Sequence, residues 1–245
     1  MLKKLPLSWS RYIPVGLTLV LGVGFSALAF ALVWDWEDRR HDYEMHRRID
    51  DISIGLERQI NSDLDAVLAL SDYMKAFSAV ERSSFARFVA RPLSVHSSLQ
   101  LLAWAPRVPN SQRANYEAQA RTETDSSFEI TERGPRGELR KASQRSEYFP
   151  AFYVEPTAGN ETALGFDLNS YPEIRVAIQR ARDTGQMIVT SYAGLTQGNS
   201  RELGLLAIVP IYENSTKPTT LESRRQLLQG LVRGVFQGKD IFQTS

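Results

Sequence analysis

Twenty-one consecutive residues without a charged side chain, 13–33, lie close to the start of this chain. At about 1.5 Å of rise per residue, a helix of this length reaches about 31 Å, enough to cross the hydrocarbon core of a bilayer. Trp34 and Trp36 follow at once, where an interfacial aromatic belt would lie. We therefore expect a transmembrane helix over 13–34, a cytoplasmic N-terminus over 1–12, and the rest of the chain outside the cytoplasm.

A cleavable signal peptide is the alternative. Lys3, Lys4 and Arg11 precede the apolar run, and Ala27-Leu28-Ala29 resembles a small-residue cleavage site. The run is longer than the apolar part of a usual signal peptide, which favours an uncleaved anchor. Basic residues flank it on both sides, so their count does not set the orientation, although long domains translocate largely regardless of charge.

Composition excludes several classes of function. The chain has no cysteine, so it has no disulfide framework, thiolate nucleophile or Cys-based metal site, as suits a periplasmic domain. Its net charge of +1 lacks the excess of positive charge that is typical of nucleic-acid-binding proteins. The three histidines, His41, His46 and His96, lack the spacing of a metal pair or a catalytic triad. We expect no metal, no cofactor and no enzymatic activity in the chain as given.

Residues 35–80 contain no proline and a single glycine, Gly55, and their apolar positions are spaced by threes and fours. This spacing predicts one long stalk helix with a narrow apolar stripe, which could pack against a partner's stalk or along its own domain. The stripe consists of Ile49, Ile52, Leu56, Ile60, Leu64, Val67, Leu70 and Met74.

Small side chains recur every four residues in the predicted span, at Thr18, Gly22 and Ser26. Such spacing permits close approach of two membrane helices, although small residues are also simply common in these helices. Together with the stalk stripe, it predicts a parallel homodimer.

Beyond the stalk, short segments typical of helices and strands alternate. Gly134-Pro135-Arg136-Gly137 is a turn signal, Ser170 and Glu173 have the spacing of a capping box, and Gly185 stands where a C-terminal cap would. The pattern predicts an α+β fold with antiparallel sheet and flanking helices. The expected helices are 85–91 (stopped by Pro92), 111–122 and 170–185, and the expected strands are 99–108, 128–131, 148–154, 187–190, 203–212 and 228–236.

Several stretches in this order resemble the CHASE domain, an extracytoplasmic sensor module of membrane receptors that include plant cytokinin receptors, bacterial histidine kinases and diguanylate cyclases. No single stretch is specific, but the ordered set is, and it covers roughly residues 85–236. The stretches are Phe85-Ala86-Arg87-Phe88 with Arg91-Pro92-Leu93, Leu102 to Val108 with Arg113 and Tyr116-Glu117, Glu147 to Pro150 with Tyr153-Val154, Leu164 to Asp167, Ala177 to Gly185, Thr190-Ser191, and Val209 to Tyr212.

The resemblance implies a sensor domain over 81–245 built of two PAS-like subdomains, one of which holds a small ligand. It places Asp167 where cytokinin receptors use an aspartate to bind the ligand. The other ligand-binding residues that we infer from the resemblance are Val189, Thr190, Tyr153 and Leu195. Family members continue into a second membrane span and a cytoplasmic output domain, so we expect this chain to be truncated before them.

The residues themselves leave two readings of Asp167. A carboxylate between Phe166 and Leu168 needs a donor if it is buried, and a ligand could supply that donor. The alternative is an anion that favours the N-terminus of the helix after Ser170.

Two charged stretches follow the 111–122 helix. We read Glu123, Asp125, Glu129 and Glu132 as surface charge rather than as paired catalytic carboxylates. The basic run around the 134–137 turn favours a solvated loop over an anion site. It consists of Arg133, Arg136, Arg140, Lys141 and Arg145.

Two classes of function remain. The first is the small-ligand sensor region of a membrane receptor, in the inner membrane with its sensor domain in the periplasm. The second is a membrane-anchored protein-interaction or assembly module that binds no small ligand.

Overall fold

The computed structural model describes residues 13–77, 79–124, 126–195, 201–213 and 218–237, apart from the side chains of 13, 15, 31–56, 192–195 and 201–203. The chain divides into two compact units, Met1–Gly55 and Leu56–Ser245. We call the second unit the head. The predicted cytoplasmic segment, 1–12, lies outside the described residues.

The first helix, α1 (Ile13–Ala76), is 64 residues long. It confirms the helix expected over the stalk, which continues without a break from the apolar run. Where they are described, the large apolar side chains between residues 17 and 30 are 60–76% exposed. Within the described part of the chain, no helix combines the length and the apolarity that crossing a membrane requires. The predicted span also includes residues 13, 15 and 31–34, whose side chains lie outside the description.

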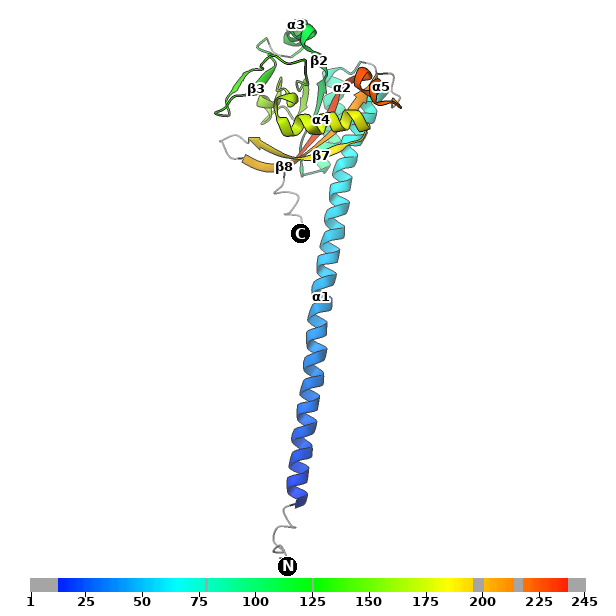
Figure 1. The fold of residues 1–245 in the computed structure, drawn as a ribbon, viewed down its shortest axis with the longest axis vertical. Helices are drawn as coiled ribbons and strands as arrows, with labels where there is room; N and C mark the ends of the chain where they lie inside the picture. Colours follow the sequence, from blue (N-terminus) through cyan, green and yellow to red (C-terminus); the bar gives the residue numbers. More distant parts are fainter. Residues whose placement is uncertain (1–12, 78, 125, 196–200, 214–217, 238–245) are drawn as a thin grey trace, which may run out of the picture. The chain divides into compact units, whose positions relative to one another are not determined.

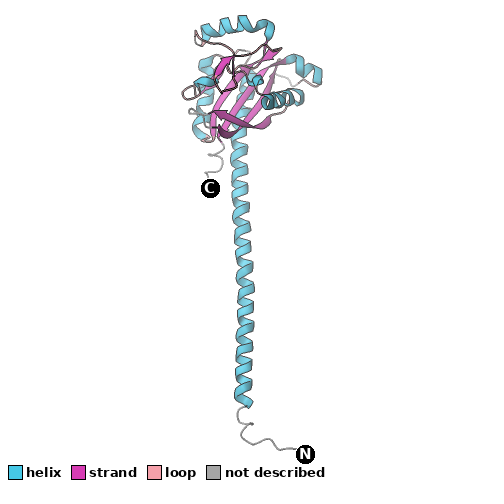
Figure 2. Cartoon of the chain, turned by 60° about the vertical axis from the view of Figure 1, so that its left-hand side comes forward, coloured by secondary structure: helices cyan, strands magenta, loops and turns pink. Residues whose placement is uncertain are grey.

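The centre of the head is a five-stranded antiparallel sheet with strand order β6-β1-β9-β8-β7. Two smaller antiparallel ladders pair β2 with β5 and β3 with β4. Figure 1 shows the strands in the head, and Figure 2 shows helices around the sheet. The strands are β1 (Leu99–Pro106), β2 (Val108–Pro109), β3 (Thr131–Arg133), β4 (Leu139–Lys141), β5 (Glu147–Tyr148), β6 (Tyr153–Glu155), β7 (Ile188–Leu195), β8 (Arg201–Tyr212) and β9 (Leu228–Gln237).

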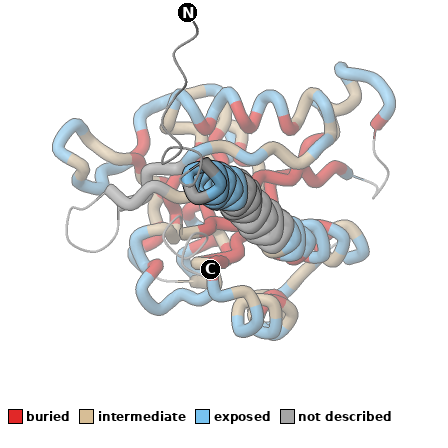
Figure 3. The backbone as a smooth tube through the Cα atoms, turned by 90° about the horizontal axis from the view of Figure 1, so that it is seen from below, coloured by how far each residue is buried: buried red, intermediate tan, exposed pale blue. Residues whose placement is uncertain are grey.

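Both faces of the sheet are covered, because successive side chains of a strand point to opposite faces. On β8, Leu206 and Ile208 join the core beneath α4 (Pro172–Thr184). Ala207 and Val209 join a second core, which includes the last turns of α1 and α2 (Arg82–Val95). Strands buried on both faces read as continuous apolar runs, which explains why 203–212 and 228–236 were recognisable. Most described residues of β1, β8 and β9 are accordingly buried, and Figure 3 shows the buried positions in red.

A third, smaller core lies between α3 (Arg113–Glu123) and the two-stranded ladders. It buries Phe128, Ile130 and Tyr148, with Tyr116 and Phe152 packed against it. The structure thus has one large sheet and two short ladders, which confirms the α+β class. The division into two PAS-like subdomains stays a prediction.

The predicted features of α4 are largely confirmed. Gly185 ends the helix with a φ of 66°, in the left-handed region that glycine adopts without strain. The expected apolar face, Ile174, Ala177, Ile178 and Ala181, is buried. The predicted capping box is wrong. Tyr171 is the N-cap without a side-chain bond, because Ser170 belongs to a preceding 3₁₀ turn, η3 (Leu168–Ser170).

Several other boundaries differ from the prediction, and β7 runs five residues past the expected strand end at residue 190. Helix α2 continues three residues beyond Pro92, because the proline stands in its last turn and costs only one backbone hydrogen bond. The strand expected over 148–154 is interrupted between β5 and β6. The strand expected over 128–131 begins only at Thr131. A short helix, α5 (Leu221–Leu227), was not predicted, although Thr220 and Ser223 form its capping box.

Candidate functional site

Asp167 is completely buried at the start of η3. Its Oδ1 accepts hydrogen bonds from two backbone N–H groups, that of Phe149 at 2.8 Å and that of Asn169 at 3.1 Å. The backbone around it pairs with a neighbouring loop, since Leu168 N–H donates to the Phe149 carbonyl at 3.1 Å. The carboxylate therefore fixes two chain segments against each other and caps η3 rather than α4.

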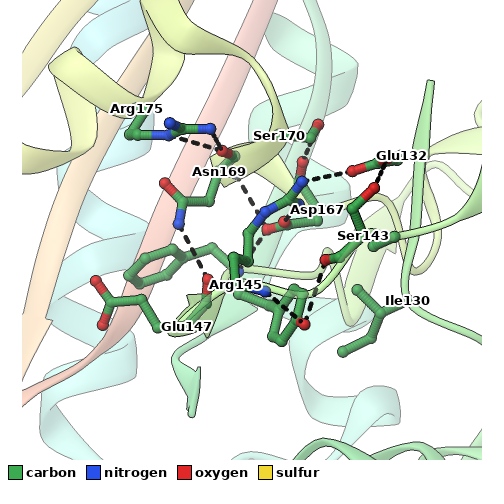
Figure 4. A network of polar contacts seen from close by, with 12 residues as sticks. Ile130, Glu132, Ser143, Arg145, Glu147, Asp167, Asn169, Ser170 and Arg175 are labelled. Carbon is green, nitrogen blue, oxygen red and sulfur yellow. Dashed lines mark hydrogen bonds and ion pairs between the residues drawn. The ribbon is translucent and has the colours of Figure 1, made fainter. Parts of the chain in front are cut away.

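Arg145 joins this carboxylate to a second one (Figure 4). Its Nη1 donates to Asp167 Oδ2, and its Nη2 donates to Glu132 Oε2 at 2.5 Å. The arginine side chain is 18% exposed, whereas the two carboxylate side chains are 0% and 5% exposed. One guanidinium thus bridges two buried carboxyl groups.

Glu132 receives further donors from the same region. Arg140 Nη2 lies 2.8 Å from Glu132 Oε1, and Ser143 Oγ donates to the same oxygen at 2.7 Å. We call Glu132, Arg140, Ser143, Arg145 and Asp167 the Arg145 network. The prediction that Glu132 is surface charge is wrong, because the alternation along β3 turns this one side chain inward.

The network changes the protonation of its members. Burial alone would raise the pKa of Glu132, but hydrogen bonds from Ser143, Arg145 and Arg140 outweigh it and hold the pKa at about 2. For Asp167 the balance is opposite: burial dominates and raises its pKa despite the bonds from Phe149 and Arg145. Burial alone would lower the pKa of Arg145, but its hydrogen bonds to Glu132 and Asp167 and their charges outweigh burial, so the pKa is raised.

The basic run around the 134–137 turn is mostly paired within the head. Besides Arg140 and Arg145, Lys141 Nζ lies 2.8 Å from Glu129 Oε1, and Arg133 donates to the Gly137 carbonyl at 2.7 Å. The prediction of a solvated loop is therefore wrong for Arg145. The turn itself is confirmed by the Gly137 N–H bond to the Gly134 carbonyl at 3.0 Å.

The residues inferred as ligand contacts do not all come together. Tyr153 is buried on β6, and its hydroxyl donates to the Val80 carbonyl at 3.0 Å. Val189, which is 41% exposed, and half-buried Thr190 lie on β7. These strands form opposite edges of the sheet, four strand spacings or about 19 Å apart. Leu195 also lies on β7, but its side chain is outside the description.

A second buried cluster, absent from our predicted sites, adjoins the Arg145 network at Tyr148. Arg113 donates to Glu117 Oε1 at 2.9 Å and to the Tyr148 hydroxyl at 3.2 Å. The same hydroxyl accepts the Arg145 backbone N–H at 3.1 Å. The sequence signal was Arg113 and Glu117, four residues apart on a helix, where opposite charges meet.

None of the described residues forms a group of three or more histidine and acidic side chains suited to a metal ion. The described polar clusters are built for hydrogen bonding and charge pairing.

The sequence model of the CHASE domain matches residues 78–245. The chain is 23% identical over 219 residues to hybrid signal transduction histidine kinase A of Dictyostelium discoideum, covering 86% of this chain and 10% of that protein. It is 23% identical over 194 residues to histidine kinase 3 of Arabidopsis thaliana (74% and 18%) and 25% identical over 193 residues to probable histidine kinase 5 of Oryza sativa subsp. japonica (74% and 16%). The matched region spans less than a fifth of each relative.

Proposed function

We propose, because the chain belongs to the CHASE domain family, that it is the extracytoplasmic small-ligand sensor region of a membrane signal-transduction receptor. The observation that carries the proposal is the family match over nearly the whole head, in a chain whose curated relatives are named histidine kinases. By analogy with them, we propose that the signal passes to a histidine kinase output domain; a diguanylate cyclase, which the family resemblance implies, is the alternative.

Membrane attachment is supported by the exposed apolar side chains of α1. Eight large apolar residues between 17 and 30 are at least 60% exposed, including Leu17, Phe25 and Phe30. A contiguous exposed apolar surface of this kind normally faces lipid or a partner. We propose that residues 13–33 span the membrane and that Thr18, Gly22 and Ser26 face a second copy in a parallel homodimer.

A route for the signal is supported by contacts within the head. Asp63 on α1 bonds Ser98, which directly precedes β1, and the Ser98 carbonyl accepts the Gln237 N–H at the end of β9 at 2.9 Å. The first helix and the last strand of the head thus meet through one serine. We propose that a ligand shifts α1 against β9, as packed elements with two arrangements can.

The ligand-binding roles of Asp167, Val189, Thr190, Tyr153 and Leu195 remain proposals. Because the Asp167 carboxylate already accepts two backbone N–H groups and Arg145, we propose that it holds the loops of the site in place. A ligand would have to displace Arg145 to reach its Oδ2.

Cell fractionation tests membrane attachment. The full chain should sediment with membranes, resist alkaline carbonate and dissolve only in detergent, with residues 1–12 still present on N-terminal sequencing. Deletion of residues 13–33 should release it. A full chain that carbonate extracts, or a mature terminus near Phe30, would refute the anchor.

A further inference from the structure

Arg82, the first residue of α2, forms no ion pair with a carboxylate among the described residues. Its Nη2 donates to the Phe152 carbonyl at 2.9 Å, and its Cζ lies 5.0 Å from the ring centre of Tyr153 and 5.9 Å from that of Phe152. Its Nε is buried and has no hydrogen-bond partner among the described residues, none of which pairs a carboxylate with this guanidinium. A buried guanidinium edge normally binds an acceptor, because it stays charged at every physiological pH.

Tyr116, on α3, presents a second unpartnered group. Its hydroxyl is buried and has no hydrogen-bond partner within the described part of the chain. Its ring lies 5.8 Å from the ring of Phe152 and 6.1 Å from that of Phe128. Burial raises the pKa of Tyr116 far above that of a free tyrosine, so the phenol keeps its proton and can donate it.

The two groups approach one place from different elements. Both side chains contact Phe152, and the charge of Arg82 acts on the phenol of Tyr116, counteracting part of the rise in its pKa. Two buried donors beside the same ring, Arg82 Nε–H and the Tyr116 hydroxyl, thus have no acceptor within the described part of the chain, which is unusual because each unmade bond costs stability.

We infer that Arg82 and Tyr116 form a binding site for a small monocarboxylate with an apolar body. The Nε–H and Nη–H of an arginine match the two oxygens of a carboxylate, and the phenol supplies a third donor. The rings of Phe152, Phe128 and Tyr153 would cover the apolar part. Burial raises the pKa of Tyr153, and the nearby carboxylates of Glu123 and Glu81 raise it further; their negative charge makes the site disfavour a doubly charged phosphate.

Arginine side-chain NMR of the full chain in detergent gives a direct test, with benzoate as the probe and benzamide as its neutral control. The Nε–H signal of Arg82 is assigned by its loss in Arg82→Lys. We expect benzoate to shift this signal saturably and benzamide to leave it in place. An unmoved signal, or an equal shift with benzamide, would overturn the inference.

Variants locate the site. Arg82→Gln should weaken benzoate binding at least tenfold, and Tyr116→Phe by about threefold to tenfold. Arg87→Gln removes a comparable but exposed arginine of the same helix and should bind as the parent does. If Arg82→Gln does not fold, Arg82→Lys keeps the cation without the planar fork and should still bind more weakly. Parent-like binding by Arg82→Lys and Tyr116→Phe would refute the site. The proposal deepens the sensor function by naming a ligand class, and its failure would leave membrane attachment unaffected.

Discussion

Two regions of the head each bury an aspartate, but they satisfy it in different ways. Asp63 on α1 is 2% exposed and accepts bonds from His96 Nδ1 at 2.7 Å, Gln59 Nε2 at 2.9 Å and the Ser98 hydroxyl. We call these four residues the Asp63 hub. Asp167 instead receives two backbone N–H groups and one arginine shared with Glu132.

The difference lies in how many groups depend on one donor. In the Asp63 hub, three separate side chains bond one carboxylate, so the loss of one donor leaves two others in place. In the Arg145 network one guanidinium bridges two buried carboxylates, so losing it leaves Asp167 without a cation and Glu132 with Arg140 alone. The first arrangement suits the adjustable joint between α1 and the sheet that we propose for signalling. The second suits a fixed core for the loops around η3.

Removing the shared arginine should have the largest effect. Arg145→Met leaves buried Asp167 without its cation and Glu132 with Arg140 as its only cation, which we expect to cost about 3–5 kcal/mol of unfolding free energy. Equilibrium urea unfolding measures it. Arg136→Gln, an exposed arginine of the same run, is the control and should change stability by less than about 0.5 kcal/mol. A loss below about 1 kcal/mol for Arg145→Met would contradict the comparison.

Acid should weaken the Arg145 network next. Because the pKa of Glu132 is held at about 2, its stabilisation is complete above the usual glutamate pKa of about 4.5 and is lost as the pH falls toward 2. We expect Glu132 to account for a loss of roughly 2–3 kcal/mol of unfolding free energy over this window.

The raised pKa of Asp167 acts with the opposite sign, since its protonation favours the folded state as the pH falls. Between pH 7 and 3, the urea midpoint should depend less steeply on pH in Glu132→Gln than in the parent, and more steeply in Asp167→Asn. If both variants followed the pH dependence of the parent, neither carboxyl group would titrate as described.

Neutralising the Asp63 hub should cost less. Asp63→Asn keeps the shape but removes the charge that strengthens three hydrogen bonds, so we expect a loss of about 1.5–2 kcal/mol. Asp65→Asn, an exposed neighbour on α1, is the matched control. An Asp63→Asn loss as large as that of Arg145→Met would remove the contrast between the two regions.

Single hydroxyl donors give the smallest effects and sharpen the comparison. Ser98→Ala in the Asp63 hub and Ser143→Ala in the Arg145 network each delete one donor to a buried carboxylate that keeps others. Each should cost about 1 kcal/mol in urea unfolding. A cost above about 3 kcal/mol for Ser98→Ala would mean that the Asp63 hub also depends on one donor.

The sequence predicted what depends on local pattern. The long helix, the strands 203–212 and 228–236, and the Gly185 cap follow from periodicity and backbone freedom. The Arg145 network could not be predicted, because Glu132, Arg145 and Asp167 are up to 35 residues apart and meet only through tertiary pairing of loops. Asp167 was singled out by its apolar neighbours, but nothing local indicated that an arginine from the basic run would bind it.

The most direct test of the proposed function is the side of the membrane on which the head lies. The chain has no cysteine, so Ala118→Cys, at an exposed position of α3, provides a unique thiol. In intact cells, a membrane-impermeant maleimide should label this cysteine fully, whereas a cysteine placed at Lys3 should react only after permeabilisation. Labelling of position 118 only after permeabilisation would place the head in the cytoplasm and contradict an extracytoplasmic sensor.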